Sequence, residues 1–223
     1  MLNTAVERHS LLLLTPQGAQ YAWENKGEPY PPSFEISGYK DIFFRLPAIA
    51  RFVCGGEISV GFSFPIINAD GRLRVASKLP ISCISGVISP WMVIECCGCG
   101  SLPSAFSAPL NELELAARSL DIRLGVFGSA ALGALTKLPY VHDRSDLDIV
   151  ITAAPPETLA SFSSEVKEVS KKYGITIDAE VKFGHEAWVK LPEILSGRGS
   201  VLVKGGHQPE VAPSSDIWGI LQV

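Results

Sequence analysis

The chain has 223 residues, of which 47% are hydrophobic and 19% are charged, with a formal net charge of −4 and a pI near 5.6. This composition is typical of a globular protein that buries a core, and it excludes a charge-rich disordered segment. The acidic balance argues against broad binding of DNA or RNA, which depends on many lysines and arginines gathered on one face. We therefore expect no nucleic-acid partner.

The hydrophobic run from Leu11 to Leu14 is far shorter than the core of a signal peptide or a membrane span. The cysteines number five, which leaves at least one without a disulfide partner. These features predict a protein of the reducing cytoplasm with no membrane partner. Cys96, Cys97 and Cys99 lack the second paired cluster that zinc requires, so we interpret them as buried small side chains.

The first part of the sequence has the pattern of short strands and turns. Hydrophobic runs at 11–14, 42–44 and 58–64 each end near a proline, and 68–71 is typical of a hairpin turn. Most of the prolines precede residue 110, and prolines interrupt helices and central strands. We predict a β-rich N-terminal domain over residues 1–105, followed by a connection rich in Gly, Ser and Pro at 98–109.

The second part alternates between helices and strands. Leu113, Ala116, Ala117 and Leu120 have the spacing of an amphipathic helix that Asn111 could cap. The remaining predicted elements are strands at 124–127, 147–152, 175–183 and 201–204, and helices at 130–138 and 156–173. The overall prediction is an α+β protein with an α/β domain and a small mixed sheet over residues 106–223.

The most informative motif is the pair Gly128-Ser129, between a predicted strand and a predicted helix. Backbone N–H groups and a hydroxyl at a helix N-terminus favour an anion such as phosphate. Sixteen residues separate Ser129 from Asp146, which is followed by Asp148. Two aspartates at i and i+2 on a strand project to the same face, so their carboxylates converge.

Paired carboxylates resist ionisation unless a cation lies between them. Oxygen ligands with no histidine beside them favour Mg²⁺ or Mn²⁺ over Zn²⁺, and Mg²⁺ commonly joins one or two carboxylates to substrate phosphates. Asp178 and Glu180 repeat the i, i+2 spacing on the next strand, and either could complete the metal site or accept a proton. Taken singly, each motif is also compatible with a tight turn or a solvent-exposed edge strand.

In combination and in this order, the motifs resemble the nucleotidyltransferase superfamily, whose fold is that of the polymerase-beta-like catalytic domains. The segment 133–140 and the motif Ser145-Asp146-Leu147-Asp148 narrow the resemblance to bacterial phosphoribosyl-dephospho-CoA transferases, the holo-acyl-carrier-protein synthases of malonate decarboxylase. Further similarities extend the match over nearly the whole chain, at 8–9, 60–61, 71–74, 178–180 and 201–204.

This resemblance implies that 2′-(5″-triphosphoribosyl)-3′-dephospho-CoA is the donor and that a serine of the apo acyl carrier protein subunit of malonate decarboxylase attacks its α-phosphate. It assigns the leaving diphosphate to Gly128 and Ser129, with Lys204 as a further phosphate ligand. It assigns the metal to Asp146 and Asp148, and the base or a further metal ligand to Asp178 or Glu180. The N-terminal domain would recognise substrate or carrier.

The sequence also departs from the family pattern. Ala131 stands soon after Gly-Ser where the family tends to carry a tryptophan, and Phe43-Phe44-Arg45-Leu46 stands where a paired arginine is usual. The first residues to test for recognition of the CoA moiety are Arg45, Arg51, Arg72 and Arg74. Two alternative functions remain at this stage. One is a generic ATP-using nucleotidyltransferase that modifies an antibiotic or a protein, and the other is a catalytically silent ligand-binding module on the same fold.

Overall fold

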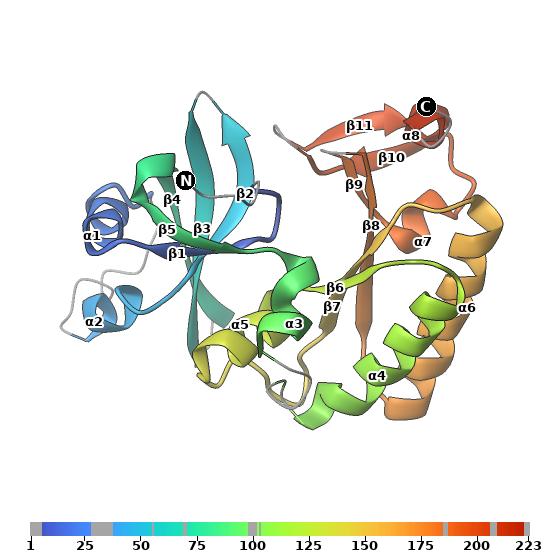
Figure 1. Cartoon of the computed structure of the whole chain (residues 1–223), viewed down its shortest axis with the longest axis horizontal. Helices are drawn as coiled ribbons and strands as arrows, with labels where there is room; N and C mark the ends of the chain where they lie inside the picture. The colour runs from blue at the N-terminus through green and yellow to red at the C-terminus, as the bar shows by residue number, and fades with distance from the viewer. Residues whose placement is uncertain are drawn as a thin grey trace. The chain divides into compact units, whose positions relative to one another are not determined.

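The structure is a computed structural model that describes residues 6–27, 38–54, 56–68, 71–97, 102, 104–184, 187–205 and 209–220 (Figure 1). It is α+β, with sheets of five, four and two strands. Two compact units form it: Met1–Ser89 with Thr136–Tyr140, and Pro90–Leu135 with Val141–Val223. This structural division falls at residue 89, ahead of the boundary predicted at residue 105.

The first unit contains the five-stranded sheet, in the order β4-β3-β2-β1-β5, and every neighbouring pair is antiparallel. Its strands are β1 (Leu11–Leu14), β2 (Ala48–Cys54), β3 (Glu57–Asn68), β4 (Gly71–Pro80) and β5 (Ile84–Ile88). The predicted β-rich character is therefore confirmed. The hairpin between β3 and β4 is also confirmed, although residues 69 and 70 of its turn lie outside the described residues.

Two helices of this unit were not predicted, α1 (Pro16–Glu24) and α2 (Tyr39–Phe43). The strand predicted at 42–44 is wrong, because α2 turns Phe43 into the core, where its ring lies 4.2 Å from that of Phe62. At α1 the Thr15 hydroxyl accepts the N–H of Gly18, which caps the helix. Short 3₁₀ and helical turns follow at η2 (Ile81–Cys83), η3 (Pro90–Met92) and α3 (Val93–Cys97).

The segment Thr136–Tyr140 explains the long spacing between Gly128-Ser129 and the aspartates, because it belongs to the first unit. The Tyr140 side chain is fully buried, and its hydroxyl donates a 2.6 Å hydrogen bond to the carbonyl oxygen of Ser63. Arg72 donates to the carbonyl oxygen of Tyr140. Five of the sixteen spacer residues thus belong to the first unit, and Tyr140 anchors them to its sheet.

The second unit contains the four-stranded sheet β6-β7-β8-β9. Its strands are β6 (Leu124–Val126), β7 (Leu147–Thr152), β8 (Ile177–Phe183) and β9 (Ala187–Lys190), and only β7 and β8 are parallel. A mixed sheet was predicted, but β9 was not. Strand β10 (Ser200–Val203) pairs with β11 (Glu210–Pro213) in a separate sheet, which meets β9 through the bridge between Trp188 and Lys204.

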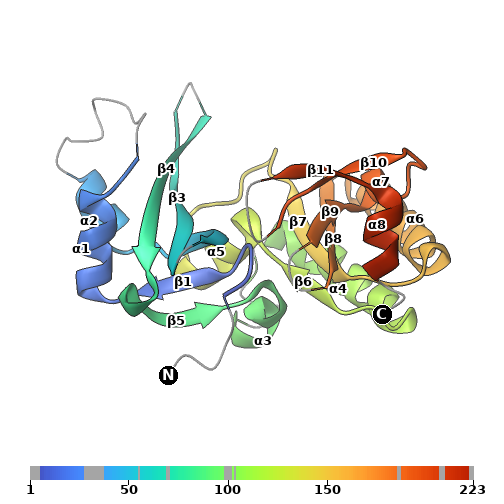
Figure 2. The same cartoon turned by 90° about the horizontal axis from the view of Figure 1, so that it is seen from above.

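Helices α4 (Ser104–Ser119) and α6 (Pro156–Tyr173) lie side by side along the four-stranded sheet (Figures 1 and 2). Helix α6 has the predicted bounds and ends at Gly174, whose φ is 63°. Helix α4 corrects the prediction of a connection at 98–109, since it begins at Ser104 and contains Pro109. The buried Phe106, Pro109 and Leu110 extend its hydrophobic face, so packing outweighs the unfavourable proline.

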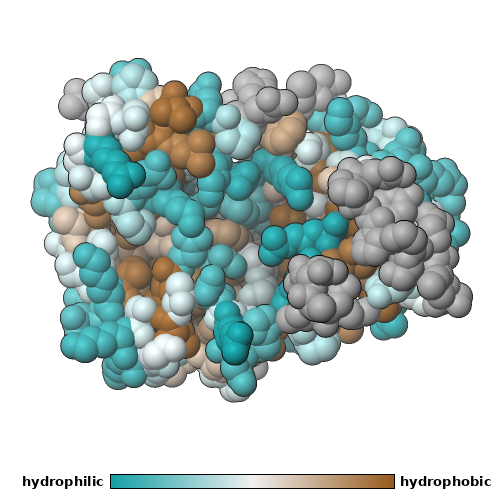
Figure 3. Space-filling model, turned by 180° about the vertical axis from the view of Figure 1, so that it is seen from behind, coloured by the Kyte–Doolittle hydropathy of each residue, from teal (hydrophilic) through white to brown (hydrophobic). Residues whose placement is uncertain are grey.

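The remaining helices are α5 (Gly128–Thr136), α7 (Leu191–Ile194) and α8 (Ser214–Gly219). Within the described part of the chain, no helix combines the length and hydrophobicity needed to cross a membrane. On the face shown in Figure 3, hydrophobic side chains form small separate patches between hydrophilic ones. Among the exposed large hydrophobic side chains are Leu115 of α4 and Val211 of β11.

Candidate active site

Strand β6 runs into helix α5 through the predicted Gly128-Ser129 turn. Gly128 has φ 65°, in the left-handed region that favours glycine. A Cβ atom at this position would lie 1.9 Å from Oδ2 of Asp148, far inside van der Waals contact. The Ser129 N–H donates to the Asp148 carboxylate, and the Phe127 N–H donates to the Asp148 carbonyl oxygen. Glycine is therefore required so that the carboxylate can approach the start of α5.

The carboxyl group of Asp148 has a strongly raised pKa. Burial, followed by the charges of Asp178, Asp146 and Glu180, raises the pKa of its carboxyl to about 7, against the lowering effect of the hydrogen bond from Ser129. Asp146 precedes β7 and is exposed. The structure thus brings together the four acidic residues that the sequence singled out, with Asp148 at their centre.

Strand register explains why these acids are neighbours. Asp148 on β7 lies opposite Asp178 on the parallel strand β8, while Glu180 lies opposite Val150. Asp178 is therefore the nearer partner of Asp148, whereas Glu180 lies two residues further along the same face. Glu180 is buried, with 3% of its surface exposed.

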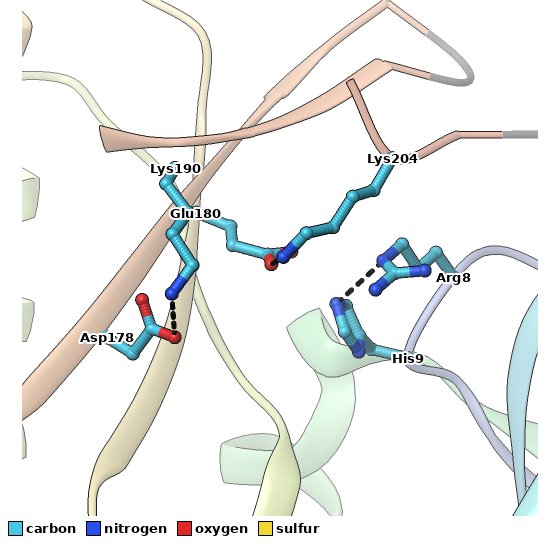
Figure 4. A network of polar contacts seen from close by, with 6 residues as sticks. All are labelled: Arg8, His9, Asp178, Glu180, Lys190 and Lys204. Atoms are coloured by element: carbon cyan, nitrogen blue, oxygen red, sulfur yellow. Dashed lines mark hydrogen bonds and ion pairs between the residues drawn. The ribbon is translucent and has the colours of Figure 1, made fainter. Parts of the chain in front are cut away.

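Each carboxylate of β8 is held by a lysine (Figure 4). Nζ of Lys190, the last residue of β9, lies 2.8 Å from Oδ2 of Asp178. Nζ of Lys204, just after β10, lies 2.9 Å from Oε1 of Glu180. The assignment of Lys204 as a phosphate ligand stays a prediction, and in this structure its ammonium group pairs with Glu180.

A hydrophobic cluster continues the same face of the sheet. Trp91, Phe127, Val150 and Trp188 pack together and are at least nine-tenths buried. Gly125 on β6 makes room for this packing, since a Cβ there would meet Trp91 and Val150 at 3.0 Å. Through Val150, two residues after Asp148 on β7, the cluster lies on the same face of the sheet as Asp148.

The donor set fits a magnesium ion that shares its ligands with a substrate. Among the residues that the structure describes, no three His, Cys, Asp or Glu side chains converge closely enough to hold a metal ion by themselves. Asp146 and Asp148 supply two carboxylates, and Mg²⁺ commonly takes one or two together with phosphate oxygens and water. Burial, and then the neighbouring charges of Asp178, Asp146 and Glu180, raise the pKa of Asp148, and a divalent cation beside the ionised carboxylate would offset both effects.

Sequence reasoning missed Lys190 and the cluster around Trp188, because β9 is only four residues long and was not recognised as a strand. The alternation of Trp188 and Lys190 is the signal that could have placed both on one face. The predicted CoA-binding residues Arg45, Arg51 and Arg72, and also Arg74, all belong to the first unit.

The fold and site together define an α+β protein in which a Gly-Ser turn holds a half-buried aspartate near three further acids. Residues 94–215 match the family model described as the phosphoribosyl-dephospho-CoA transferase MdcG C-terminal domain. The match covers more than half of the chain. The chain belongs to this transferase family.

Individual relatives agree with this assignment. The chain is 24% identical to the phosphoribosyl-dephospho-CoA transferase of Xanthomonas axonopodis pv. citri over 213 residues, which is 95% of this chain and 96% of the relative. It is 27% identical to the protein of the same name from Xanthomonas euvesicatoria, over 78% of this chain and 82% of the relative. The Bradyrhizobium diazoefficiens protein is 25% identical, over 88% and 85%. No solved structure matches the chain.

Proposed function

We propose that this chain transfers the phosphoribosyl-dephospho-CoA group from 2′-(5″-triphosphoribosyl)-3′-dephospho-CoA to a serine of the apo acyl carrier protein subunit of malonate decarboxylase, releasing diphosphate. The observation that carries the proposal is the contact between Gly128 and Asp148, where the start of a helix meets a half-buried carboxylate near three others. The name shared by the relatives supports the transferred group.

The order β6, α5, β7, α6, β8 supports a nucleotidyltransferase fold for the second unit. In this proposal the N-terminus of α5, with the Ser129 hydroxyl, binds oxygens of the departing diphosphate. The developing negative charge is stabilised there because these donors are fixed in place before the reaction. Lys204, 22% exposed at its side chain, is within the same unit and is a further candidate for this charge.

Asp146 and Asp148 would hold Mg²⁺. When bound, the ion would neutralise the triphosphate oxygens and favour attack at the α-phosphate. Because Asp148 is fixed by Gly128 and Ser129, its carboxylate needs little rearrangement on binding.

Asp178 is the better candidate for the base that accepts the serine proton. It is the register partner of Asp148 and is 32% exposed at its side chain, so an acceptor hydroxyl can reach it. Glu180 is 4% exposed at its side chain and bonded to Lys204, which suits a residue that positions this lysine. The roles that the sequence left open between the two acids are thus divided by burial.

Donor competition tests the proposal against a generic ATP-using enzyme. Diphosphate release would be measured with apo carrier subunit and either triphosphoribosyl-dephospho-CoA or ATP as donor. We expect release only with the CoA-derived donor, at a rate that Asp148→Asn lowers at least about 100-fold. Glu168→Gln, on the exposed side of α6, is the matched control and keeps the wild-type rate. Release with ATP alone would favour the generic enzyme, and no release with either donor would favour a binding module.

A further inference from the structure

Lys190 forms an ion pair with Asp178, one of the acids of the proposed metal site. Its backbone lies opposite Glu180, yet its side chain extends to Asp178, the neighbour of Asp148. The hydrogen bond to Asp178 and the charges of Asp178, Glu180 and Asp148 all raise the pKa of Lys190. One ammonium group therefore lies in the field of three of the four acids.

The two lysines of the site differ in how firmly they are held. The pair of Glu180 and Lys204 has side-chain exposures of 4% and 22%, whereas the pair of Asp178 and Lys190 has 32% and 44%. Breaking a buried pair leaves an uncompensated charge away from water, while an exposed pair exchanges partners at little cost. The ion pair of Lys190 is therefore the exchangeable one.

We propose that Lys190 is the resident counter-cation of the acid cluster, competing with a divalent cation for the negative charge of Asp178 and Asp148, and that its ion pair with Asp178 opens when the cation binds. This inference rests on the proposed function, since it takes the cluster as a metal site. It assigns Lys190 as a positioning residue that keeps Asp178 in place before the metal arrives and leaves its carboxylate accessible afterwards.

The first test is a calorimetric titration of the full-length, metal-free chain with Mn²⁺ at about pH 8, where carboxylates are ionised. Lys190→Met removes the competing cation, and we expect about 1.5-fold to fivefold tighter binding, the range set by an exposed ion pair. Lys190→Arg keeps the charge and stays near the wild-type affinity. Lys171→Met, exposed on α6, changes the net charge equally and controls for long-range effects. Unchanged or weaker binding by Lys190→Met overturns the inference, as does an equal gain in Lys171→Met.

A second measurement uses the unmutated chain and so does not depend on the folding of a variant. Acetylation of lysines by an activated ester would be followed by peptide mass spectrometry with and without Mn²⁺. Opening of the ion pair predicts faster acetylation of Lys190 with Mn²⁺ and no change at Lys171; an unchanged or slower rate at Lys190 contradicts it. Mn²⁺ binding with no effect at Lys190 refutes this inference alone, whereas absence of Mn²⁺ binding refutes both it and the metal-dependent function.

Discussion

Replacing Gly128 by alanine tests the contact on which the proposed site depends. The substitution places a Cβ atom 1.9 Å from Oδ2 of Asp148 and 2.7 Å from its Cγ, on a backbone with φ 65°. The carboxylate or the turn must move, since neither distance is compatible with van der Waals contact. We therefore expect losses of both stability and activity.

The expected loss of stability in Gly128→Ala has two contributions. A non-glycine residue in the left-handed region costs roughly 1–2 kcal/mol. Overpacking a tight site adds about 1–3 kcal/mol, so Gly128→Ala should destabilise the fold by about 2–5 kcal/mol in total. Displacing the carboxylate by about 1 Å should reduce the transfer rate by about 100-fold.

Gly174→Ala is the matched control. Gly174 has φ 63°, almost the same backbone conformation, but a Cβ there would meet no atom within 4 Å. It should lose only the conformational part, about 1–2 kcal/mol, with an unchanged transfer rate. Urea unfolding and a transfer assay on both variants make the comparison. Equal activity in Gly128→Ala and Gly174→Ala would refute the reasoning that the carboxylate position matters.

Three further substitutions test the structure through their expected effects on stability. In metal-free protein the raised pKa of Asp148, about 7 against 3.8, means that the contribution of this one group to stability is highest below about pH 4, is lost as the pH rises from about 4 to 7 by an amount on the order of 4 kcal/mol, and is constant above that range. Asp148→Asn should remove this contribution from the pH dependence of thermal unfolding between about pH 5 and 8. Tyr140→Phe removes the bond to the Ser63 carbonyl and should cost about 1–3 kcal/mol in urea unfolding. Gly18→Ala should destabilise the fold although alanine favours helices by about 0.5–1 kcal/mol, because its Cβ would lie 2.4 Å from the Cys83 carbonyl oxygen.

Each of these expectations has a contradicting outcome. Parallel pH profiles of wild type and Asp148→Asn would mean that the carboxylate is not desolvated in the fold. A Tyr140→Phe variant as stable as wild type would show that the buried hydroxyl contributes nothing. Stabilisation by Gly18→Ala would show that helix propensity outweighs the contact with Cys83.

The fold was predictable where periodicity was long and regular. Helix α6 and strand β7 have the predicted bounds because Leu159, Phe162 and Val166 repeat at helical spacing and Leu147 and Ile149 alternate with polar residues. Prediction failed where tertiary packing decides. Phe43 was predicted in a strand, but it packs beside Phe62 from helix α2. Pro109 was predicted in a connection, but it lies inside helix α4.

The acid cluster was predictable because the period of two on strands fixes which side chains share a face. What the sequence could not supply was the pairing between strands, which makes Asp178 rather than Glu180 the partner of Asp148. The positions of Lys190 and Lys204 near these acids depend on further strand pairing, through the β8–β9 register and the bridge between Trp188 and Lys204. The long spacing between Ser129 and Asp146 also depends on tertiary structure, because Tyr140 within it anchors in the first unit.

Intact mass spectrometry of the carrier subunit tests the central proposal most directly. Apo acyl carrier protein of malonate decarboxylase would be incubated with this chain, triphosphoribosyl-dephospho-CoA and Mg²⁺, next to a carrier whose acceptor serine is replaced by alanine. The account predicts a mass gain of one phosphoribosyl-dephospho-CoA group, absent from the alanine carrier and from reactions with Asp148→Asn. An unmodified wild-type carrier, or full modification by Asp148→Asn, would contradict it.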